Sequence, residues 1–368
     1  MIKLSQPNIS DAAIEAVVDV LKSGNLVQGV QCEAFEYELA EYLGCSDVVL
    51  ASSGTAALHL ALLSLGIGPG DAVIVPDFTF PATANVVKIT GATSVIVDVD
   101  RDTYTLSIEN LESVIRDWNG PDQLKAIMPV HEFGCPVQMD EVNRLAKEHS
   151  LFVVEDAACA LGATYKGTKV GTLGDIGCFS FHPRKTLTTG EGGALATNSP
   201  SLAKRLRRLR SHGMERTGSQ VQFIEPGLNY RMTDFQAVLG RHQLPDLDKW
   251  IKDRAALVEV YRSELSALEQ RGIIKLPARV EGHSWQTLMI TLDAEVNRDE
   301  LIKSMRGKGT EVNLGAQSLS SIGIYSDSKF KCKNGSYLYQ SGLALPLYEN
   351  LDRSGVNTIS GSLIKCLK

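Results

Sequence analysis

Residues 47–66, DVVLASSGTAALHLALLSLG, combine a short apolar run, a turn of small residues and a run of good helix formers. This order predicts a buried strand that passes through Ser53-Gly54-Thr55 into a helix. Further apolar runs of strand length occur at DAVIVP, TSVIVDVD, KAIMPVHEFG and FVVEDAA, with helical stretches such as MDEVNRLAKEHS between them. Strands rich in Val, Ile and Leu that alternate with helices predict a mainly parallel α/β sheet covered by helices on both faces.

The sequence changes in character after about residue 240. The long helical stretch LPDLDKWIKDRAALVEVYRSELSALEQRG leads to WQTLMITLD, NRDELIKSMRGKG and SGLALPLY. We therefore expect a large α/β domain at 1–240 and a smaller C-terminal α+β domain at 241–368. The basic run RLRRLRSHG (205–213) carries leucines on one helical face, which predicts the solvated side of a helix rather than an anion-binding patch.

Composition excludes several classes of function. The 368 residues are 43% hydrophobic and 22% charged, with a net charge of −6, and this acidic balance argues against a nucleic-acid partner. No signal-peptide pattern is evident, and no apolar run approaches the ~18 residues of a membrane span. The seven cysteines are scattered and never spaced C-x-x-C, so we predict reduced thiols, no metal site and a cytoplasmic location.

Three motifs indicate a binding site. In the first, Gly54 and Thr55 open a helix directly after a strand, where free N–H groups and the helix dipole favour a phosphate. A serine or threonine that merely caps the helix is the alternative. In the second, FVVED ends on Asp156, at the edge of a parallel sheet where ligands bind, although this carboxylate could equally cap a following helix.

The third motif is FSFHPRKTLTTGEGG (179–193), where Lys185 follows a strand and is surrounded by aromatic residues and glycines. Either the lysine reaches water by its stem, or it is partly desolvated, which would lower its pKa and make it a nucleophile. A lysine, a strand-end carboxylate and a phosphate cradle together match the needs of pyridoxal 5′-phosphate. The lysine forms a Schiff base with the aldehyde, the carboxylate keeps the pyridine nitrogen protonated, and the helix terminus binds the phosphate.

These motifs, with VPDFTFPATAN, EDAACALGA and GLNYRMTDFQAVLG, resemble the DegT-type sugar aminotransferases, a branch of the fold type I pyridoxal-phosphate enzymes. The resemblance runs from about residue 6 to LALPLY at 343–348. It implies a seven-stranded-type sheet in the large domain, and Lys185 and Asp156 as the catalytic pair. The residues that it implies for cofactor binding are Gly54, Thr55, Phe80, Asp156, Cys159, Ser180, Lys185 and Asn229.

Each of these roles has its own chemistry. The resemblance implies that Gly54, Thr55 and Ser180 hold the phosphate and that Phe80 stacks on the pyridine ring. It also implies a homodimer in which Asn229 reaches the phosphate of the other subunit's cofactor, although this asparagine could equally be a turn residue. Cys159 departs from the family, which usually has a glutamine that helps to hold the ring hydroxyl. A thiol bonds weakly, so we expect Cys159 to be a neighbour of the cofactor without catalytic weight.

The resemblance implies transfer of an amino group from an amino acid, with L-glutamate expected, to a nucleotide-linked keto sugar by a ping-pong mechanism. A related sugar dehydratase, which carries histidine at the Schiff-base position, and a non-catalytic regulator are the alternatives. Loops at 25–31, 213–226 and 313–335 are expected to select the sugar. His182 is expected to be structural and Glu191 to order the loop after the lysine, whereas His131 could touch substrate or fix a turn.

Overall fold

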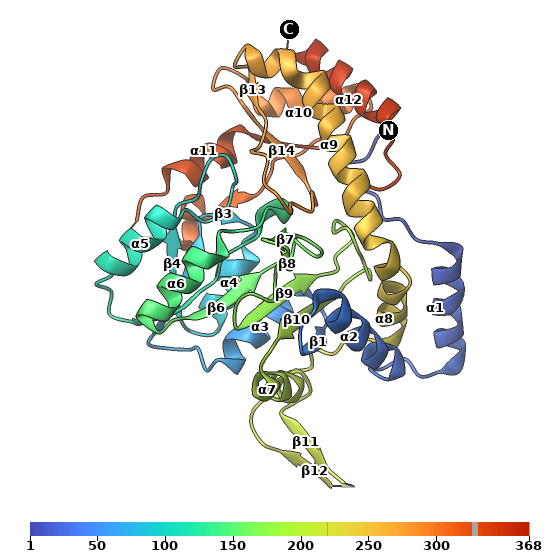
Figure 1. The fold of residues 1–368 in the computed structure, drawn as a ribbon, viewed down its shortest axis with the longest axis vertical. Coiled ribbons are helices and arrows are strands. Elements are labelled where there is room, and N and C mark those ends of the chain that lie inside the picture. Colours follow the sequence, from blue (N-terminus) through green and yellow to red (C-terminus); the bar gives the residue numbers. More distant parts are fainter. Residues whose placement is uncertain (219, 326–329, 368) are drawn as a thin grey trace.

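The computed structural model describes residues 1–218, 220–325 and 330–367. Parts of two loops predicted to select the sugar, at 219 and 326–329, and the last residue of the predicted C-terminal domain, 368, lie outside the described residues. A seven-stranded sheet with helices around it forms the centre of the molecule (Figure 1). Its strands are β1 (Asp47–Ala51), β2 (Asp71–Pro76), β4 (Thr93–Val97), β5 (Gln123–Ile127), β6 (Phe152–Asp156), β9 (Ile176–Ser180) and β10 (Gly193–Thr197).

The strand order is β1-β10-β9-β6-β5-β2-β4. The pairs from β9 through to β4 are parallel, whereas β10 runs antiparallel to both of its neighbours, β1 and β9. The predicted α/β fold with a mainly parallel seven-stranded sheet is confirmed. All of these strands except β10 run in the same direction, so their carboxyl ends lie at one edge of the sheet and the residues that follow them meet there.

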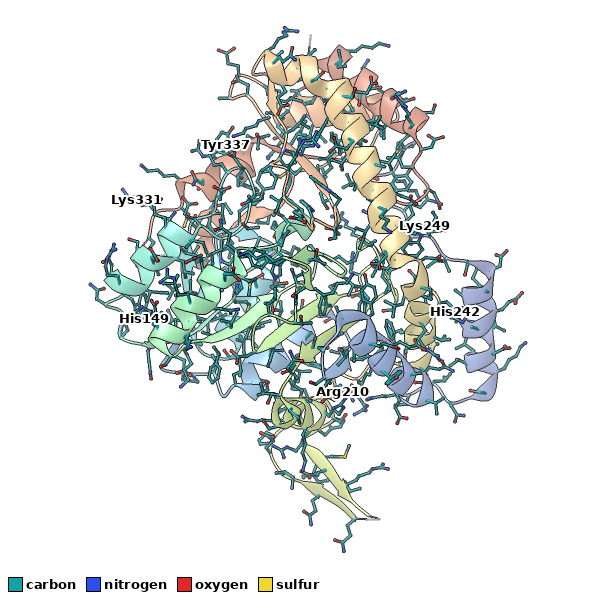
Figure 2. The ribbon with its side chains drawn as sticks, viewed as in Figure 1. His149, Arg210, His242, Lys249, Lys331 and Tyr337 are labelled. Atoms are coloured by element: carbon teal, nitrogen blue, oxygen red, sulfur yellow. The ribbon has the colours of Figure 1, made fainter. Side chains whose placement is uncertain are left out.

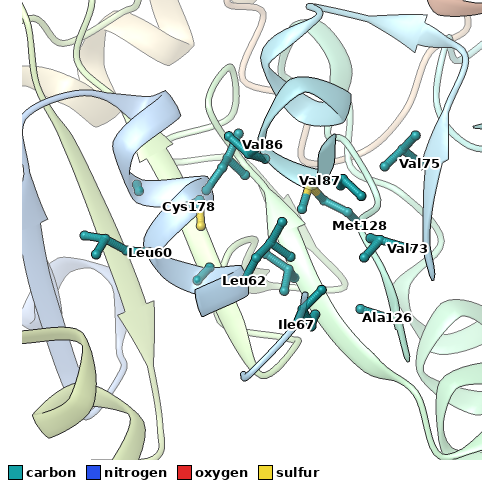
Figure 3. Close-up of a cluster of buried hydrophobic side chains, with 14 of the residues drawn as sticks. Leu60, Leu62, Ile67, Val73, Val75, Val86, Val87, Ala126, Met128 and Cys178 are labelled. Atoms are coloured by element: carbon teal, nitrogen blue, oxygen red, sulfur yellow. The ribbon is translucent and has the colours of Figure 1, made fainter. Parts of the chain in front are cut away.

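Helices bury both faces of this sheet. Alternate strand residues point to opposite sides, so Val49 and Val73 join one core whereas Leu50 and Ile74 join cores on the other side. Figure 3 shows the first core, where apolar side chains of two helices pack against the strands. The helices around the sheet are α1 (Asp11–Ser23), α2 (Val30–Leu43), α3 (Gly54–Ser64), α4 (Ala82–Ile89), α5 (Ile108–Asp117), α6 (Met139–His149), α7 (Pro200–Arg210) and α8 (Asp234–Arg241).

Several short strands and 3₁₀ turns lie outside the seven-stranded sheet. The hairpin of β11 and β12 projects away from the body of the molecule (Figure 1). The short strands are β3 (Phe78–Thr79), β7 (Thr164–Tyr165), β8 (Thr168–Lys169), β11 (Met214–Thr217), β12 (Gln220–Phe223) and β15 (Gln317–Ser318). The 3₁₀ turns are Glu132–Gly134, Leu244–Asp246, Leu319–Ser321 and Gly323–Tyr325.

The chain after residue 246 builds a second, antiparallel sheet in the order β13-β14-β16, with its own apolar core (Figure 1). The N-terminus lies against this part of the chain, since Ile2 N donates to Gly309 O, just after α10, at 2.8 Å. We propose the boundary near residue 240 as the division between two domains. The elements here are α9 (Leu247–Gln270), β13 (Ile274–Lys275), β14 (Leu288–Leu292), α10 (Arg298–Gly307), α11 (Lys333–Ser341), β16 (Gly342–Leu345) and α12 (Arg353–Cys366).

The basic run on α7 differs from its prediction. Leu206 and Leu209 are buried as expected, but the arginines are not simply solvated. Arg210 is buried where α7 approaches α2 (Figure 2), and its Nη1 donates to Glu36 Oε1 at 2.6 Å and to Leu50 O at 2.8 Å. The prediction of a solvated face was wrong because these acceptors come from elements distant in the sequence, which periodicity does not reveal.

A buried ion pair fastens α9 to the C-terminal segment. Arg254 is 1% exposed, and its Nε donates to Glu349 Oε1 at 2.8 Å while its Nη1 donates to the carbonyls of Trp285 and Leu347. Arg254→Met leaves Glu349 buried without its cation, so we expect a loss of about 3–5 kcal/mol in the free energy of unfolding. Urea denaturation of the variant and the parent measures this loss. Lys249→Met, on the exposed side of the same helix (Figure 2), is the control and should unfold like the parent.

Candidate active site

The three sequence motifs meet at one edge of the central sheet. Asp156 ends β6 and pairs in register with Cys178 of β9, and Ser180 at the end of β9 lies opposite Gly193 of β10. Gly193 in turn lies opposite Ala51, where β1 leads into the turn before α3. The strand ends therefore bring the carboxylate, the lysine loop and the α3 N-terminus together, although about 100 residues separate the first motif from the second.

Lys185 lies in a turn in which its N–H donates to His182 O at 2.8 Å. Its Nζ donates to Cys159 Sγ at 2.9 Å. Burial acts to lower the pKa of Lys185, but the adjacent Cys159 and the Glu132 and Asp156 carboxylates outweigh it, so the pKa is raised. Of the two alternatives considered for Lys185, the one in which desolvation lowers its pKa is therefore wrong. The sequence indicated that Lys185 would be desolvated, but it did not indicate which anionic groups would lie near its amine.

The Asp156 carboxyl is buried and held from two directions. Thr83 Oγ1 donates to its Oδ2 at 2.8 Å, and Ala158 N donates to its Oδ1 at 3.1 Å. Burial raises the pKa of Asp156, while these two hydrogen bonds and the charge of Lys185 oppose the rise. A cationic ring nitrogen at this point would pair with the carboxylate and favour its ionised form. The alternative role as a helix cap receives little support, since a turn rather than a helix follows β6.

The start of α3 lies against the end of β9. Ser53 is the N-cap, and its Oγ accepts from Ala56 N at 3.1 Å. A Cβ at Gly54 would lie 2.7 Å from the Ser180 Cβ, so only glycine permits this approach. Thr55 is exposed, with its hydroxyl not needed for the cap. Ser53 thus performs the capping, which leaves Gly54, Thr55 and Ser180 around the first N–H groups of the helix.

Two of the predicted residues stand apart from this cluster. Phe80 lies between β3 and α4 and is 72% exposed, which leaves a flat aromatic face open. Asn229 is also exposed, and its backbone pairs with Ser211 at the base of the β11–β12 hairpin. The roles predicted for both residues stay predictions, and the Asn229 role requires a second subunit.

The residues with ambiguous predictions have structural partners. His131 is fully buried, with Nε2 2.9 Å from Glu155 Oε2 and Nδ1 accepting from Val137 N, so it fixes a turn. His182 Nδ1 accepts from Arg184 N at 3.2 Å within the lysine loop. Glu191 is exposed, and its backbone carbonyl accepts hydrogen bonds from Thr189 and Gln236. It therefore orders the loop through its backbone rather than its carboxylate.

Three polar residues at the site were missed by the sequence analysis. Thr83 binds Asp156, and Thr79 Oγ1 lies 3.2 Å from Thr83 Oγ1. Glu132 is buried beside them, and burial raises its pKa to about 8. The sequence offered one indication for Glu132 alone. It directly follows His131, a residue already considered as a substrate contact.

The C-terminal part of the chain also reaches this edge of the sheet. β15 pairs with β3, Ser318 Oγ donates to Asp77 Oδ2 at 2.8 Å, and Ser320 N donates to Asp77 Oδ1 at 2.7 Å. Part of the predicted 313–335 loop therefore docks beside the segment that carries Thr79 and Phe80. A cavity of about 940 Å³ lies elsewhere, between α1, α2 and α8, and we do not assign the chemistry to it because Lys185 and Asp156 are not among its lining residues.

Comparison with known proteins identifies the family. The model of the DegT/DnrJ/EryC1/StrS aminotransferase family matches residues 7–364. The chain belongs to this family. The GDP-perosamine synthase of Escherichia coli O157:H7 is 36% identical over 368 residues, covering 98% of this chain and 97% of that protein. The DegT-type resemblance seen in the sequence is therefore confirmed.

Solved structures agree with this assignment. The aminotransferase TlmJ of Streptoalloteichus hindustanus has a TM-score of 0.92 and 31% identity, covering 100% of this chain and 99% of that one. The pyridoxal-phosphate form of Spr1654 of Streptococcus pneumoniae has a TM-score of 0.89 and 28% identity, covering 99% and 98%. The chain is a sugar aminotransferase of the DegT type, an enzyme that uses pyridoxal phosphate.

The residues present fit this cofactor. The Lys185 amine and the buried Asp156 carboxyl interact electrostatically, and the α3 N-terminus approaches Ser180 so closely that a side chain at Gly54 is excluded. This donor set suits an aldehyde, a ring nitrogen and a phosphate. Over the described ranges, no helix is long and apolar enough to cross a membrane, and no group of three or more His, Cys, Asp or Glu is arranged to hold a metal ion.

Proposed function

We propose that this enzyme moves an amino group from L-glutamate to a nucleotide-linked keto sugar by a ping-pong mechanism. The observation that carries the proposal is Lys185 at the carboxyl edge of the sheet, with the buried Asp156 carboxyl beside the same site. The similarity to a GDP-perosamine synthase supports a sugar acceptor carried on a nucleotide. GDP-linked keto sugars are therefore the first acceptors to test.

Each residue has a defined task in this mechanism. When bound, pyridoxal phosphate supplies an aldehyde that combines with amines and a ring that accepts electrons from the substrate carbon. Lys185 Nζ would be the amine that binds the aldehyde, and as a neutral amine it would remove the proton from the α-carbon of the donor. The Asp156 carboxylate would keep the ring nitrogen protonated, and Gly54, Thr55 and Ser180 would hold the phosphate.

Other residues define the remaining walls of the site. Phe80, whose ring is open to solvent here, is proposed to stack on the cofactor ring. Cys159 contacts Lys185 rather than offering the strong hydrogen bond of a glutamine amide, so we assign it a place beside the ring hydroxyl. The sugar is proposed to contact the loops at 25–31, 213–226 and 313–335.

Steady-state kinetics test the reaction type. With L-glutamate as donor, we expect double-reciprocal plots at several concentrations of a GDP-linked keto sugar to be parallel, and 2-oxoglutarate to form in equal amount to the amino sugar. The free keto sugar without its nucleotide is the matched control and should react poorly. Intersecting plots would contradict the ping-pong order, and equal rates with the free sugar would contradict the nucleotide linkage.

The two alternatives predict different results. A dehydratase of this family would carry histidine where Lys185 stands, and it would release a deoxy sugar rather than an amino sugar. A regulator would show neither reaction, and it has no need for Lys185 and Asp156 in one site. The free thiols of the described residues support a reducing compartment, so we propose that the enzyme works in the cytoplasm.

A homodimer is proposed on the basis of the exposed apolar surface. Exposed apolar side chains occur on α1, on the segment that leads into α2 and its first residue, and on the β11–β12 hairpin and the residue after it, and such surfaces mark interaction sites. These residues are Ile14, Val18, Leu21, Leu26, Val27, Val30, Val221, Phe223 and Ile224. In such a dimer we propose that Asn229 reaches the phosphate site of the partner.

Sedimentation tests this assembly. We expect the purified protein at micromolar concentration to sediment as a species of about twice the 39.9 kDa chain mass. Phe223→Asp places a charge on the exposed hairpin and should shift the distribution toward the monomer. A stable monomer with full activity would refute both the dimer and the Asn229 role.

A further inference from the structure

One side chain from the C-terminal part of the chain reaches the loop that carries Lys185. Gln286 lies just before β14, and its Nε2 donates to Arg184 O at 2.6 Å. The Arg184 carbonyl and the Lys185 N–H belong to one peptide plane, and this N–H donates to His182 O at 2.8 Å. Both polar groups of the plane that precedes the Lys185 side chain are therefore held, one of them by a residue 102 positions away.

The surroundings of Gln286 fix its amide in this orientation. Thr287 Oγ1 donates to Gln286 Oε1 at 3.0 Å, which leaves the Nε2 end free to donate to the lysine loop. The Gln286 backbone is held as well, because its N–H donates to Phe133 O at 3.0 Å and its carbonyl accepts from Arg254 Nη1 at 3.0 Å. Little conformational freedom is therefore lost when the amide binds Arg184 O, so the bond is preorganised.

The chain bends sharply just before Gln286. Trp285 has a left-handed φ of 53° and is 7% exposed. Its ring stacks on His283 with the ring centroids 3.7 Å apart, and its backbone N–H donates to His283 Nδ1 at 2.9 Å. A residue with a side chain adopts this backbone conformation only where the surrounding contacts impose it. The stacked pair therefore maintains the bend that places Gln286 beside the lysine loop.

The same segment, 283–287, also packs near the thiol that contacts the lysine amine. Lys185 Nζ donates to Cys159 Sγ at 2.9 Å. A Cβ at Gly134 would lie 2.3 Å from Ser284 Oγ and 3.2 Å from Cys159 O. The segment and the Cys159 backbone thus meet at this glycine. The segment therefore approaches both the backbone and the amine end of the lysine.

We propose that Gln286 is a positioning residue for Lys185, an inference that rests on the proposed role of the lysine. The amide of Gln286 fixes the peptide plane before Lys185, and this plane sets the direction in which the lysine side chain leaves the backbone. Without the hydrogen bond the plane is free to rotate, and Lys185 Nζ is less often placed to meet the aldehyde and the α-carbon of the donor. A displacement of about 1 Å from such a position costs about 10²-fold in rate.

The first test compares two forms of the cofactor on the cofactor-free protein. Pyridoxal phosphate carries the aldehyde that Lys185 Nζ would bind, whereas pyridoxamine phosphate has no aldehyde and depends on noncovalent contacts alone. Gln286→Met keeps the length of the side chain and removes the donor. We expect this variant to bind pyridoxal phosphate about tenfold more weakly, the effect of one hydrogen bond, and to bind pyridoxamine phosphate as the parent does. Calorimetric titration measures both affinities.

The second test is the glutamate half-reaction, followed in a single turnover. Because Lys185 is the proposed base, poorer placement of its amine should slow removal of the α-proton. In Gln286→Met we expect the rate constant at saturating L-glutamate to fall about tenfold, with the half-saturating concentration unchanged. Donor deuterated at the α-carbon should react more slowly still, which identifies the observed step. Partial unfolding would lower the amplitude but not the rate constant, so an unchanged rate constant would overturn the proposal.

Matched variants separate the donor from the shape of the side chain. Gln286→His retains a ring N–H that can donate, so it should recover part of the affinity for pyridoxal phosphate. Thr287→Val releases the amide and should weaken the same affinity by a smaller factor. Gln270→Met, at the exposed end of α9, is the control and should bind both cofactor forms as the parent does. If Gln286→Met does not fold, the proposal is judged on Thr287→Val.

The binding results distinguish this proposal from the proposed function. Equal weakening of both cofactor forms in Gln286→Met would show a purely structural role, and unchanged affinity for both would show that the hydrogen bond has no effect; either result overturns the proposal. Lys185→Ala is the reference. If it binds pyridoxal phosphate as tightly as the parent, the proposed role of Lys185 fails and this inference fails with it. Weak binding by Lys185→Ala with parent-like binding by Gln286→Met overturns the role of Gln286 alone.

Discussion

Lys185→Ala is expected to lower turnover at least about 10⁴-fold, because both the covalent anchor of the cofactor and the base for the α-carbon proton are lost. The remaining site still has the α3 N-terminus, the Asp156 carboxyl and Ser180, so the variant should bind pyridoxamine phosphate. Rate measurements with L-glutamate and calorimetric titration with pyridoxamine phosphate check the two parts. Normal turnover by this variant would refute the role of Lys185.

Cys159 provides an independent check on the same variant. Lys185 Nζ lies 2.9 Å from Cys159 Sγ, and its charge acts to lower the pKa of that thiol. Loss of the ammonium should therefore raise the pKa of Cys159 and slow its alkylation at a given pH. Lys303→Ala, on the exposed surface of α10, is the control and should leave turnover and alkylation unchanged. A faster Cys159 reaction in Lys185→Ala would contradict the observed geometry.

Asp156→Asn is expected to lower turnover by about 10²–10³-fold, the usual effect of removing one preorganised electrostatic group. The amide oxygen can still accept from Ala158 N, and the Thr83 hydroxyl can turn to accept from the amide NH2, so the fold should survive. What the variant loses is the negative charge that holds the ring nitrogen protonated. The measurements are turnover with L-glutamate and the thermal midpoint of the cofactor-free protein.

In Asp156→Asn, turnover should fall while the thermal midpoint of the protein stays unchanged. Because burial already raises the pKa of Asp156, a neutral side chain there costs little stability, and the thermal midpoint should not fall. A large fall in the midpoint with unchanged turnover per folded molecule would show that Asp156 is only structural. Glu155 is unsuitable as a matched variant, since its carboxylate accepts from the Gly171, Leu173 and Gly174 N–H groups and supports the fold.

The fold could be predicted because its signals are local. Strands such as DAVIVP and helices such as MDEVNRLAKEHS show their type in their own composition, and both elements occur where expected. The position of β10, antiparallel between β1 and β9, was not predicted. The pairing of β1 with β10 joins segments more than a hundred residues apart, and no local sequence pattern indicates it.

The site was predictable where strand ends determine it. Asp156 and Lys185 were predicted at the carboxyl edge, where functional groups in a parallel sheet gather, and both lie there, while their catalytic roles stay predictions. The threonines at 79 and 83 and Glu132 were not recognised, because their importance arises only when β3, α4 and the turn after β5 converge. The predicted direction of the Lys185 pKa failed for the same reason, since its anionic neighbours come from other elements.

The most direct test of the central claim is an absorbance spectrum of the protein loaded with pyridoxal phosphate, before and after excess L-glutamate. We predict a band near the visible edge that moves to shorter wavelength with glutamate and returns when a nucleotide-linked keto sugar is added. A band that does not respond to glutamate would contradict the proposed donor. No band at all, even after incubation with the cofactor, would contradict the role of Lys185 and favour a non-catalytic regulator.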